Sequence, residues 1–210
     1  MGCTEPIAIA YGAAKCREAL GTIPEQVTIG LSGNIVKNVK GVTVPNSGGM
    51  KGIEASVALG ILAGDATAEL EVLSSITEED RKRVKAYLAE DRIAVTLLNG
   101  DAKLHITLTM VAEGRVAELE IMHLHTNIVY LAVDNKVLID GDRTALEETE
   151  QQETTTPMSV EGILTFAEGA DLQCLEELIG PQIEHNIAIC EEGMKNSWGA
   201  EVGKTVHDIS

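Results

Sequence analysis

A cysteine at the start of a predicted helix is the clearest candidate for chemistry in this sequence. Cys3 lies in the string Gly2-Cys3-Thr4-Glu5-Pro6, directly before a helical pattern. The free N–H groups and the positive dipole end of a helix favour the thiolate form of a cysteine placed there. Cys3 is therefore a candidate nucleophile, or a candidate ligand of a metal ion or iron–sulfur cluster. The alternative is a small residue that only begins the helix.

A second candidate group is the string His123-Leu124-His125-Thr126-Asn127. On a strand the two histidines would face the same side, and Thr126 and Asn127 would offer hydrogen-bonding groups at the strand end. His125 is the candidate general base, because an unperturbed histidine titrates near neutral pH. Thr126 and Asn127 are candidate substrate-binding residues. The alternative is a polar strand end without a functional role.

A glycine-rich stretch supplies the third group. Asn34, Lys37 and Asn38 are candidate substrate-binding residues, and the range 45–49 that follows them reads PNSGG. Backbone amides of such a loop, together with a lysine, can hold a carboxylate. The alternative is a set of simple turns, which is the commoner role of glycine-rich loops.

The fourth group lies near the carboxyl end of the chain. Its members are Asn186, Glu191, Glu192, Gly193, Trp198 and Gly199. Two adjacent glutamates diverge by about 100° on a helix, so they do not form a catalytic carboxylate pair. This pattern favours a solvated helix end.

The helices and strands predicted around these residues indicate an α+β fold. Helices are predicted over 4–20, 50–64 and 77–90, a strand over 25–31, and an ordered loop with a short helix or strand over 32–49. Thr77 and the acidic residues after it are typical of a helix N-terminus. The helix over 50–64 is nearly all apolar with small residues on one face, so we expect it to be buried and closely packed.

An antiparallel β-meander is predicted next, followed by helices. Its strands cover 92–98, 103–112, 115–123, 127–134 and 136–140, with turn signals between several of them. An acidic loop over 141–157 leads to helices over about 158–168, 170–179 and 181–194. The organisation is thus an N-terminal helical and αβ segment (1–91), the meander (92–140), the loop, and a C-terminal helical segment (158–210). We expect one globular fragment of a larger enzyme, because both ends resemble cuts through a longer chain.

Composition restricts the classes of partner. The chain has 210 residues, of which 44% are apolar and only 2% aromatic, and its formal net charge is −17. So negative a chain repels phosphate, which argues against nucleic acid and anionic membranes as partners. We recognise neither a membrane-spanning apolar run nor a secretory signal, and therefore expect a cytoplasmic protein with reduced thiols. The expected partner is a small-molecule substrate.

Several strings of the sequence together resemble one family. They are GCTEPIAIAYGAA, NIVKNVKGVTVPNSGG, IEASVALGILAG, HTNIV, and NIAICEEG with a following WG. In this order and rough spacing they resemble the L-cysteine desulfidase family, whose members include serine dehydratase alpha-chain-like proteins. The likeness covers nearly the whole chain, but it corresponds only to the N-terminal part of such an enzyme.

The resemblance implies an iron–sulfur lyase. Such enzymes carry a [4Fe–4S] cluster held by three cysteines, with the fourth iron open to substrate. They eliminate hydrogen sulfide from L-cysteine to give pyruvate and ammonia, or water from L-serine in the related dehydratases. By this resemblance Cys3 is the first cluster ligand. The family's other ligand cysteines lie in SNSGSGNQG-like and CDGA-like strings, which this sequence lacks, so Cys16, Cys174 and Cys190 are not predicted as ligands.

These expectations leave alternatives open. Three thiolates are needed to hold such a cluster with one open iron, so we expect this chain alone to bind none stably and to be inactive. An amino-acid-binding or regulatory α+β module without catalysis would also suit the strands and polar loops. An assembly domain, forming a homo-oligomer through the apolar helix over 50–64, is the third hypothesis.

Overall fold

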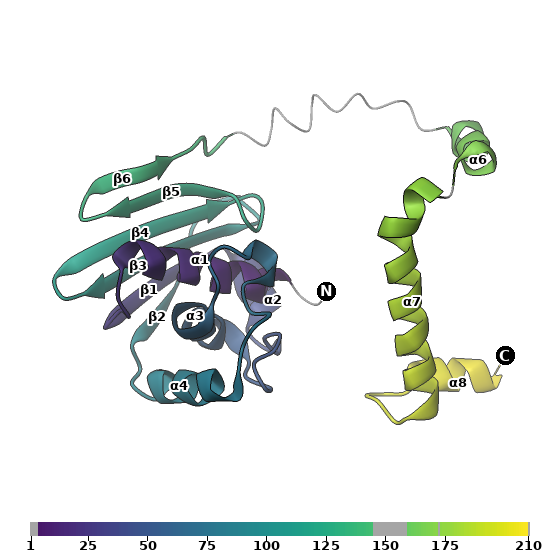
Figure 1. Ribbon diagram of the computed structural model, residues 1–210, viewed down its shortest axis with the longest axis horizontal. Coiled ribbons are helices and arrows are strands. Elements are labelled where there is room, and N and C mark those ends of the chain that lie inside the picture. The colour runs from purple at the N-terminus through teal and green to yellow at the C-terminus, as the bar shows by residue number, and fades with distance from the viewer. Residues whose placement is uncertain (1–3, 145–158, 172, 210) are drawn as a thin grey trace. The chain divides into compact units, whose positions relative to one another are not determined.

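The chain divides into two compact units in the computed structural model, which describes residues 4–144, 159–171 and 173–209. Unit 1 extends from Met1 to Gln152, and unit 2 extends from Glu153 to Ser210. Figure 1 shows that unit 1 combines a sheet with helices, whereas the described part of unit 2 is helical. The acidic loop predicted over 141–157 lies mostly outside the described residues.

Unit 1 contains a six-stranded mixed sheet. Its strands are β1 (Gln26–Leu31), β2 (Ile93–Leu97), β3 (His105–Ala112), β4 (Arg115–Met122), β5 (Ile128–Val133) and β6 (Lys136–Asp140). Their spatial order is β2-β1-β3-β4-β5-β6, and every neighbouring pair is antiparallel except β1 with β2. The predicted α+β class is therefore confirmed, and strands β3 to β6 form an antiparallel meander as predicted.

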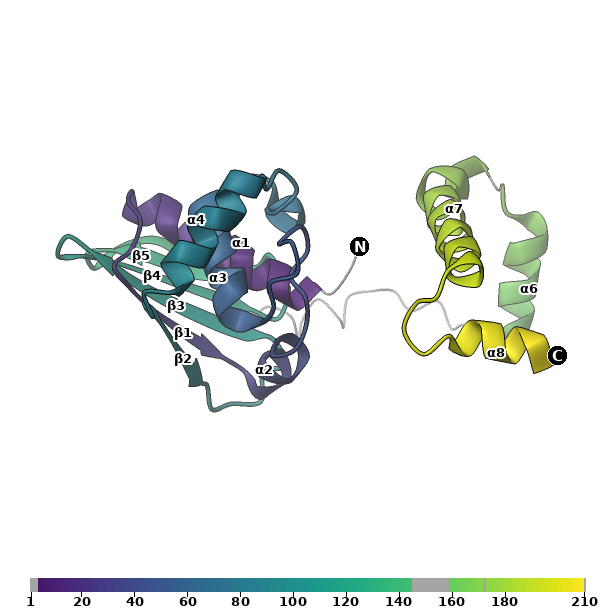
Figure 2. The ribbon, with the colours of Figure 1, turned by 90° about the horizontal axis from the view of Figure 1, so that it is seen from below.

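Helices cover one face of this sheet. They are α1 (Thr4–Leu20), α2 (Gly33–Val39), α3 (Gly52–Ala63), the short 3-10 helix η1 (Glu69–Glu71) and α4 (Glu78–Leu88). Figure 2 shows α1, α3 and α4 together on the same side of the strands. The sheet residues facing them are apolar: in β3, Ile106, Leu108 and Met110 are buried and alternate with half-buried polar residues. This period of two is what a half-covered sheet requires.

The first strand of the predicted meander belongs elsewhere in the sheet. β2 pairs in parallel with β1, so that Val27 lies opposite Ile93 and Leu31 lies opposite Leu97. The intervening α2, α3 and α4 form the crossover that a parallel pair needs. Turn signals report only local reversals of the chain, so the sequence predicts β2 next to β3. In the structure β1 lies between these two strands.

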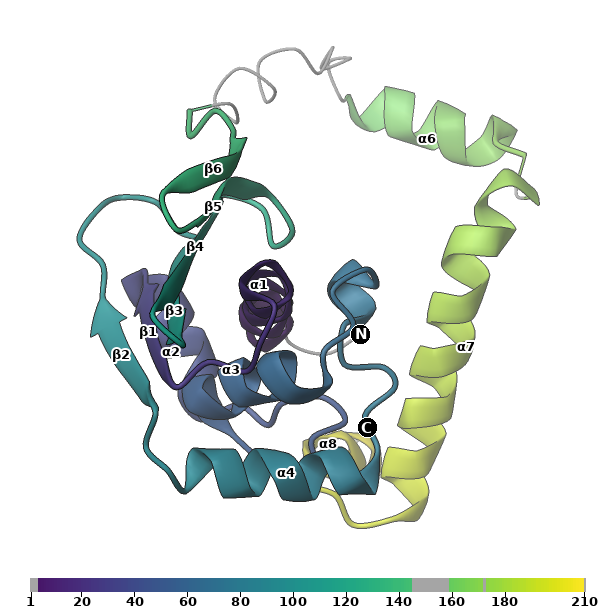
Figure 3. The same ribbon diagram turned by 60° about the vertical axis from the view of Figure 1, so that its left-hand side comes forward.

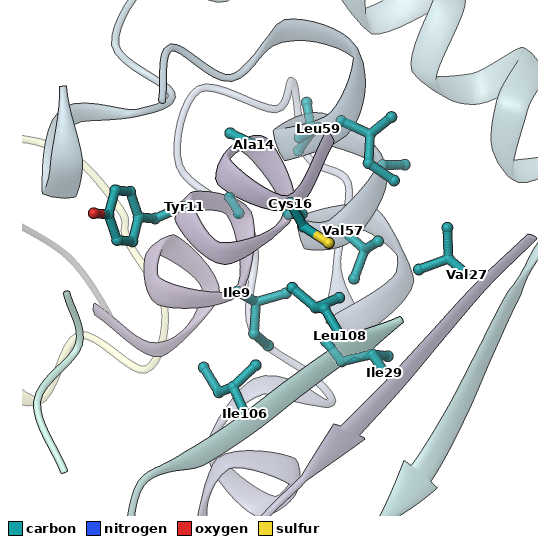
Figure 4. Close-up of a cluster of buried hydrophobic side chains, with 14 of the residues drawn as sticks. Ile9, Tyr11, Ala14, Cys16, Val27, Ile29, Val57, Leu59, Ile106 and Leu108 are labelled. Carbon is teal, nitrogen blue, oxygen red and sulfur yellow. The ribbon is translucent and has the colours of Figure 1, made fainter. Parts of the chain in front are cut away.

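The two most buried helices pack at very short range. Ala10 and Ala14 of α1 are fully buried, and an added Cβ at Gly60 of α3 would lie 2.2 Å from the Ala10 carbonyl oxygen. Figure 4 shows larger side chains, among them Ile9 and Leu108, filling the space between α1 and the sheet. The predicted burial and close packing of the helix over 50–64 is thus confirmed. That helix lies inside unit 1, so it does not offer the exposed apolar face on which the assembly hypothesis depended.

Unit 2 consists of amphipathic helices with little burial. They are α6 (Val160–Gly169), α7 (Gln173–Lys195) and α8 (Val202–Ile209). None of the side chains described in this unit is fully buried. The two helices predicted on either side of residue 180 are one continuous helix, α7, with Pro181 inside it. A proline removes one backbone hydrogen bond and disfavours the preceding turn, but it does not always end a helix.

No helix in the described ranges of the chain combines the length and the apolar character that crossing a membrane requires.

Candidate functional site

The start of α1 brings two of the predicted motifs together. The Thr4 hydroxyl lies 3.1 Å from Nε2 of His125, although the two residues are 121 positions apart in the sequence. Both side chains are half-buried. The hydroxyl can donate to an unprotonated Nε2 or accept from a protonated one, so the contact suits a histidine that exchanges a proton. Cys3, which precedes Thr4, lies outside the described residues.

The third predicted group reaches this region through one residue. Asn38 of α2 donates from Nδ2 to Oε1 of Glu5 at 2.9 Å, which fastens α2 to the first turn of α1. Asn34 and Lys37 are exposed on α2, and neither side chain forms a hydrogen bond or ion pair with the described residues. The structure therefore brings Asn38, but not the other two, into contact with the GCTEP motif.

The HTN motif forms a turn rather than the beginning of a strand. β4 ends at Met122 and β5 begins at Ile128. His123 has a positive φ of 70°, and its Nε2 lies 2.7 Å from the Arg143 carbonyl oxygen. The Asn127 side chain donates from Nδ2 to the Met122 carbonyl oxygen at 3.1 Å, which closes the turn. This turn sends His123 and His125 to different partners, whereas a strand would have placed them on one side.

A groove with a volume of about 440 Å³ lies beside α1. It is lined by Tyr11, Lys15, Glu18 and Ala19 of α1, Thr126 and Asn127 of the turn, and Ile128, Leu131 and Ile139 of the strands. Figure 3 looks nearly along α1 and shows it beside the end of the sheet formed by β4, β5 and β6. The volume falls within the roughly 300–1,000 Å³ typical of small-molecule sites. Two predicted binding residues, Thr126 and Asn127, thus face a small-molecule-sized space.

Sequence reasoning missed the polar residues on the α1 side of this groove. In the sequence Tyr11 follows the apolar helical spacing of Ile7, Ala10 and Ala14, and Lys15 and Glu18 are typical of the exposed side of a helix. The available signal is their spacing: Thr4, Tyr11, Lys15 and Glu18 follow one another at intervals of seven, four and three, which places them on one helical face. Their relation to the HTN motif depends on a long-range contact that no local pattern reports.

Of the two cysteines whose side chains the structure describes, Cys16 does not suit an iron–sulfur cluster. Cys16 is fully buried, and its thiol donates to the Ala117 carbonyl oxygen at 3.6 Å. Burial, with a smaller contribution from Glu118, raises the pKa of Cys16 to about 12, so this thiol stays protonated at neutral pH. Cys190 is exposed on α7. Within the part of the chain that the structure describes, no three His, Cys, Asp or Glu side chains are arranged to hold a metal ion.

The fourth predicted group forms local contacts within unit 2. Glu192 accepts hydrogen bonds from Asn196 Nδ2 at 2.7 Å and from Trp198 Nε1 at 3.2 Å. Glu191 lies 3.4 Å from the ammonium of Lys195, one helical turn away. An apolar groove lined by His185, Ala188, Ile189, Glu192, Gly193 and Trp198 adjoins them. These contacts stabilise the end of α7, which is the role expected of a solvated helix end.

Together, the fold and these sites define an α+β protein with a polar groove beside its first helix. The chain is 40% identical over 206 residues to a UPF0597 protein of Treponema denticola, covering 98% of this chain and 48% of that protein. It is 44% identical over 212 residues to a UPF0597 protein of Finegoldia magna, covering 99% of this chain and 50% of that protein. A UPF0597 protein of Bacteroides thetaiotaomicron is 37% identical over 205 residues, covering 97% and 47% respectively.

The chain therefore spans about half the length of the curated relatives it matches. Their name states no reaction, substrate or cofactor, so the resemblance to cysteine desulfidases remains a prediction. No protein-family model and no solved structure matches the chain.

Proposed function

We propose that this chain is the substrate-binding part of an iron–sulfur-dependent L-cysteine desulfidase. One observation supports it most: the contact of 3.1 Å between Thr4 and His125 joins the GCTEP and HTNIV motifs, which carry the resemblance to that family. The proposed reaction is a carbon–sulfur lyase reaction. L-cysteine loses its α-proton and its sulfur as hydrogen sulfide, and water hydrolyses the resulting enamine, through its imine form, to pyruvate and ammonia.

In this proposal His125 accepts the α-proton. Its ring is half-buried and is oriented by the Thr4 hydroxyl, as a positioned base requires. Thr126 and Asn127 line the neighbouring groove and bind the substrate. The Glu5–Asn38 hydrogen bond keeps α2 against the first turn of α1, which supports the same region.

The cluster does not enter these steps. When bound, a [4Fe–4S] cluster with an open iron would supply Lewis-acid stabilisation of the leaving sulfur. Cys16 is too buried and too weakly acidic to be a ligand, and neither Cys16 nor Cys190 stands in the strings that carry the family's other ligand cysteines. Because the relatives are about twice as long as this chain, we propose that two of the three ligands lie in sequence beyond it.

Sulfide release tests the proposed function. The test protein is an intact protein as long as the UPF0597 relatives. After anaerobic reconstitution with iron and sulfide, it is expected to release hydrogen sulfide from L-cysteine and to form pyruvate in an amount equal to the hydrogen sulfide. The 210-residue chain treated in the same way is expected to be inactive. Release by the chain at a rate comparable with that of the intact protein would contradict the placement of cluster ligands outside it. An intact protein that binds amino acids without turnover would contradict the lyase proposal.

Variants of the HTN motif separate binding from chemistry. In the intact enzyme Asn127→Ala is expected to raise KM for L-cysteine by roughly 5–150-fold, the usual effect of losing one hydrogen-bond partner. His125→Ala is expected to lower kcat by about 100-fold if this histidine is the base. Steady-state kinetics, with iron content measured on each variant, check both expectations. Wild-type kinetics in both variants would show that the turn only closes the β4–β5 connection through the bond of Asn127 to Met122.

Two other functions are alternatives to the cysteine desulfidase proposal. L-serine in place of L-cysteine would make the protein a serine dehydratase, and a comparison of pyruvate formation from the two amino acids decides between them. A small-molecule-sized groove also suits an amino-acid-binding or regulatory module without catalysis. Binding of L-cysteine without sulfide release by the reconstituted intact protein would establish that module instead.

A further inference from the structure

The side chain of Tyr11 ends at the groove beside α1. Tyr11 is only 5% exposed, and it lines the groove together with the HTN turn. Its hydroxyl forms no hydrogen bond with any residue in the described ranges. In Figure 4 its ring points away from the neighbouring core side chains such as Ile9 and Cys16. The hydroxyl is not among the buried polar atoms without a partner, so it is accessible from the groove and can donate a hydrogen bond to a molecule bound there.

Two opposite charges lie next to this hydroxyl on the same helix face. Lys15 and Glu18 follow Tyr11 by four and seven residues and line the same groove. Their charged groups are 3.7 Å apart, and their side chains are 28% and 55% exposed. An ion pair this exposed contributes little to stability and is easily opened. A ligand carrying both an anion and a cation can therefore insert between them without a large loss of free energy.

The environment of Tyr11 keeps its hydroxyl protonated. Burial raises the pKa of Tyr11, and the negative charges of Glu69 and Glu18 raise it further. The hydroxyl is therefore a hydrogen-bond donor at neutral pH, which suits a carboxylate. Glu18 supplies the opposite charge, which suits an ammonium group.

The other wall of the groove provides neutral polar groups. Asn127 uses its Nδ2 to close the turn, so its Oδ1 has no partner among the described residues. The Thr126 hydroxyl likewise forms no hydrogen bond within the described part of the chain. The remaining lining is apolar and comes from Ile128, Leu131 and Ile139. A small side chain with one polar atom matches this wall better than a long or charged one.

We propose that this groove binds a free α-amino acid, with the carboxylate held by Lys15 and Tyr11 and the ammonium group held by Glu18. The side chain of the amino acid then points toward Thr126 and Asn127. This inference rests on the proposed function for the identity of the amino acid. It assigns three further residues to an amino-acid site along α1 from the Thr4–His125 pair, because Lys15 and Glu18 lie about 16–21 Å from Thr4 along the helix axis.

Titration calorimetry of the 210-residue chain with reduced L-cysteine tests the assignment. L-cysteine and L-serine are expected to bind. The analogue 3-mercaptopropionate lacks the ammonium group and cysteamine lacks the carboxylate, so each is expected to bind at least about tenfold more weakly than L-cysteine. Absence of binding by L-cysteine and by L-serine, or equal affinities for L-cysteine and both analogues, would overturn the proposal.

Charge-neutralising variants identify which residue holds which group. Lys15→Gln and Glu18→Gln are each expected to weaken L-cysteine binding at least about tenfold. Lys15→Gln should not weaken cysteamine binding further, because that analogue has no carboxylate for Lys15 to hold, and Glu18→Gln should not weaken 3-mercaptopropionate binding further. The exposed pair of Glu79 and Lys82 on α4 has the same i,i+3 spacing, with the acidic residue first, and its charged groups are 3.5 Å apart. Glu79→Gln and Lys82→Gln are therefore matched controls, and both should retain wild-type affinity.

Tyr11→Phe separates a ligand contact from a structural role. Because the hydroxyl has no partner among the described residues, we expect the thermal midpoint to stay the same or rise while L-cysteine affinity falls about threefold to tenfold. A fall in the thermal midpoint with unchanged affinity would contradict the assignment.

The outcomes also distinguish this inference from the proposed function. An intact protein that releases sulfide, together with a chain whose L-cysteine affinity is unaffected by Lys15→Gln and Glu18→Gln, would overturn the inference and leave the lyase proposal standing. Charge-dependent binding by the chain, together with an intact protein that never releases sulfide, would support the inference and overturn the lyase proposal.

Discussion

In the chain carrying Gly60→Ala, unit 1 is expected to lose at least about 3 kcal/mol of unfolding free energy, more than most single substitutions cost. The added Cβ would lie 2.2 Å from the Ala10 carbonyl oxygen and 2.8 Å from the Ala10 Cα. That obstacle is the backbone of a buried helix, so no side chain can rotate to relieve it. Helices α1 and α3 would have to separate, and the core between them would lose its packing.

The aromatic residues allow this loss to be assigned to one unit. Tyr11, Tyr87 and Tyr130 all lie in unit 1, whereas Trp198 is the sole tryptophan of the chain and lies in unit 2. In denaturant, the unfolding midpoint measured by near-ultraviolet tyrosine dichroism should therefore fall to a lower denaturant concentration. The midpoint measured by tryptophan fluorescence should not change.

A second glycine provides the matched control. An added Cβ at Gly33, the first residue of α2, would meet only Leu97 Cδ1 at 4.0 Å. Gly33→Ala should accordingly leave the unfolding free energy of unit 1 near that of the wild type. If Gly60→Ala and Gly33→Ala have the same unfolding free energy for unit 1, then α1 and α3 do not pack as closely as described.

That contact is one of the features the sequence could predict. A nearly all-apolar helix with small residues on one face has to be buried and can approach a neighbour closely, and α3 does both. Local hydrogen bonding was also predictable: Thr77 forms a capping box with Asp80 at the start of α4. In both cases the physical cause lies within one short segment of the chain.

Features that depend on distant segments could not be predicted in the same way. The parallel partner of β2 is β1, more than sixty residues earlier, and no turn signal reports that pairing. The site shows the same limit. The residue types in the GCTEP and HTN motifs could be recognised, but the contact of Thr4 with His125 depends on how β4 and β5 place their turn beside α1. Lys15 and Glu18 were missed because, without that turn, they belong to an ordinary exposed helix face.

The largest effect on activity is expected at Cys3. In the intact protein Cys3→Ser should abolish both the cluster and sulfide release, because an alkoxide ligand at neutral pH is far less available than a thiolate. Serine is close to cysteine in size, so the fold should be retained. Iron and acid-labile sulfide content, the cluster absorbance and the tyrosine dichroism of unit 1 measure these properties separately.

The other cysteines serve as controls for this substitution. Cys16→Ser is the sharpest of them, because the Cys16 thiol is fully buried, has its pKa raised to about 12, and donates to the Ala117 carbonyl oxygen. A serine hydroxyl can make the same donation, so iron content and activity should persist even if some stability is lost. Cys174→Ser and Cys190→Ser are expected to retain the cluster as well. If Cys3→Ser keeps full iron content, then Cys3 only begins the first helix, and the ligand assignment taken from the resemblance is wrong.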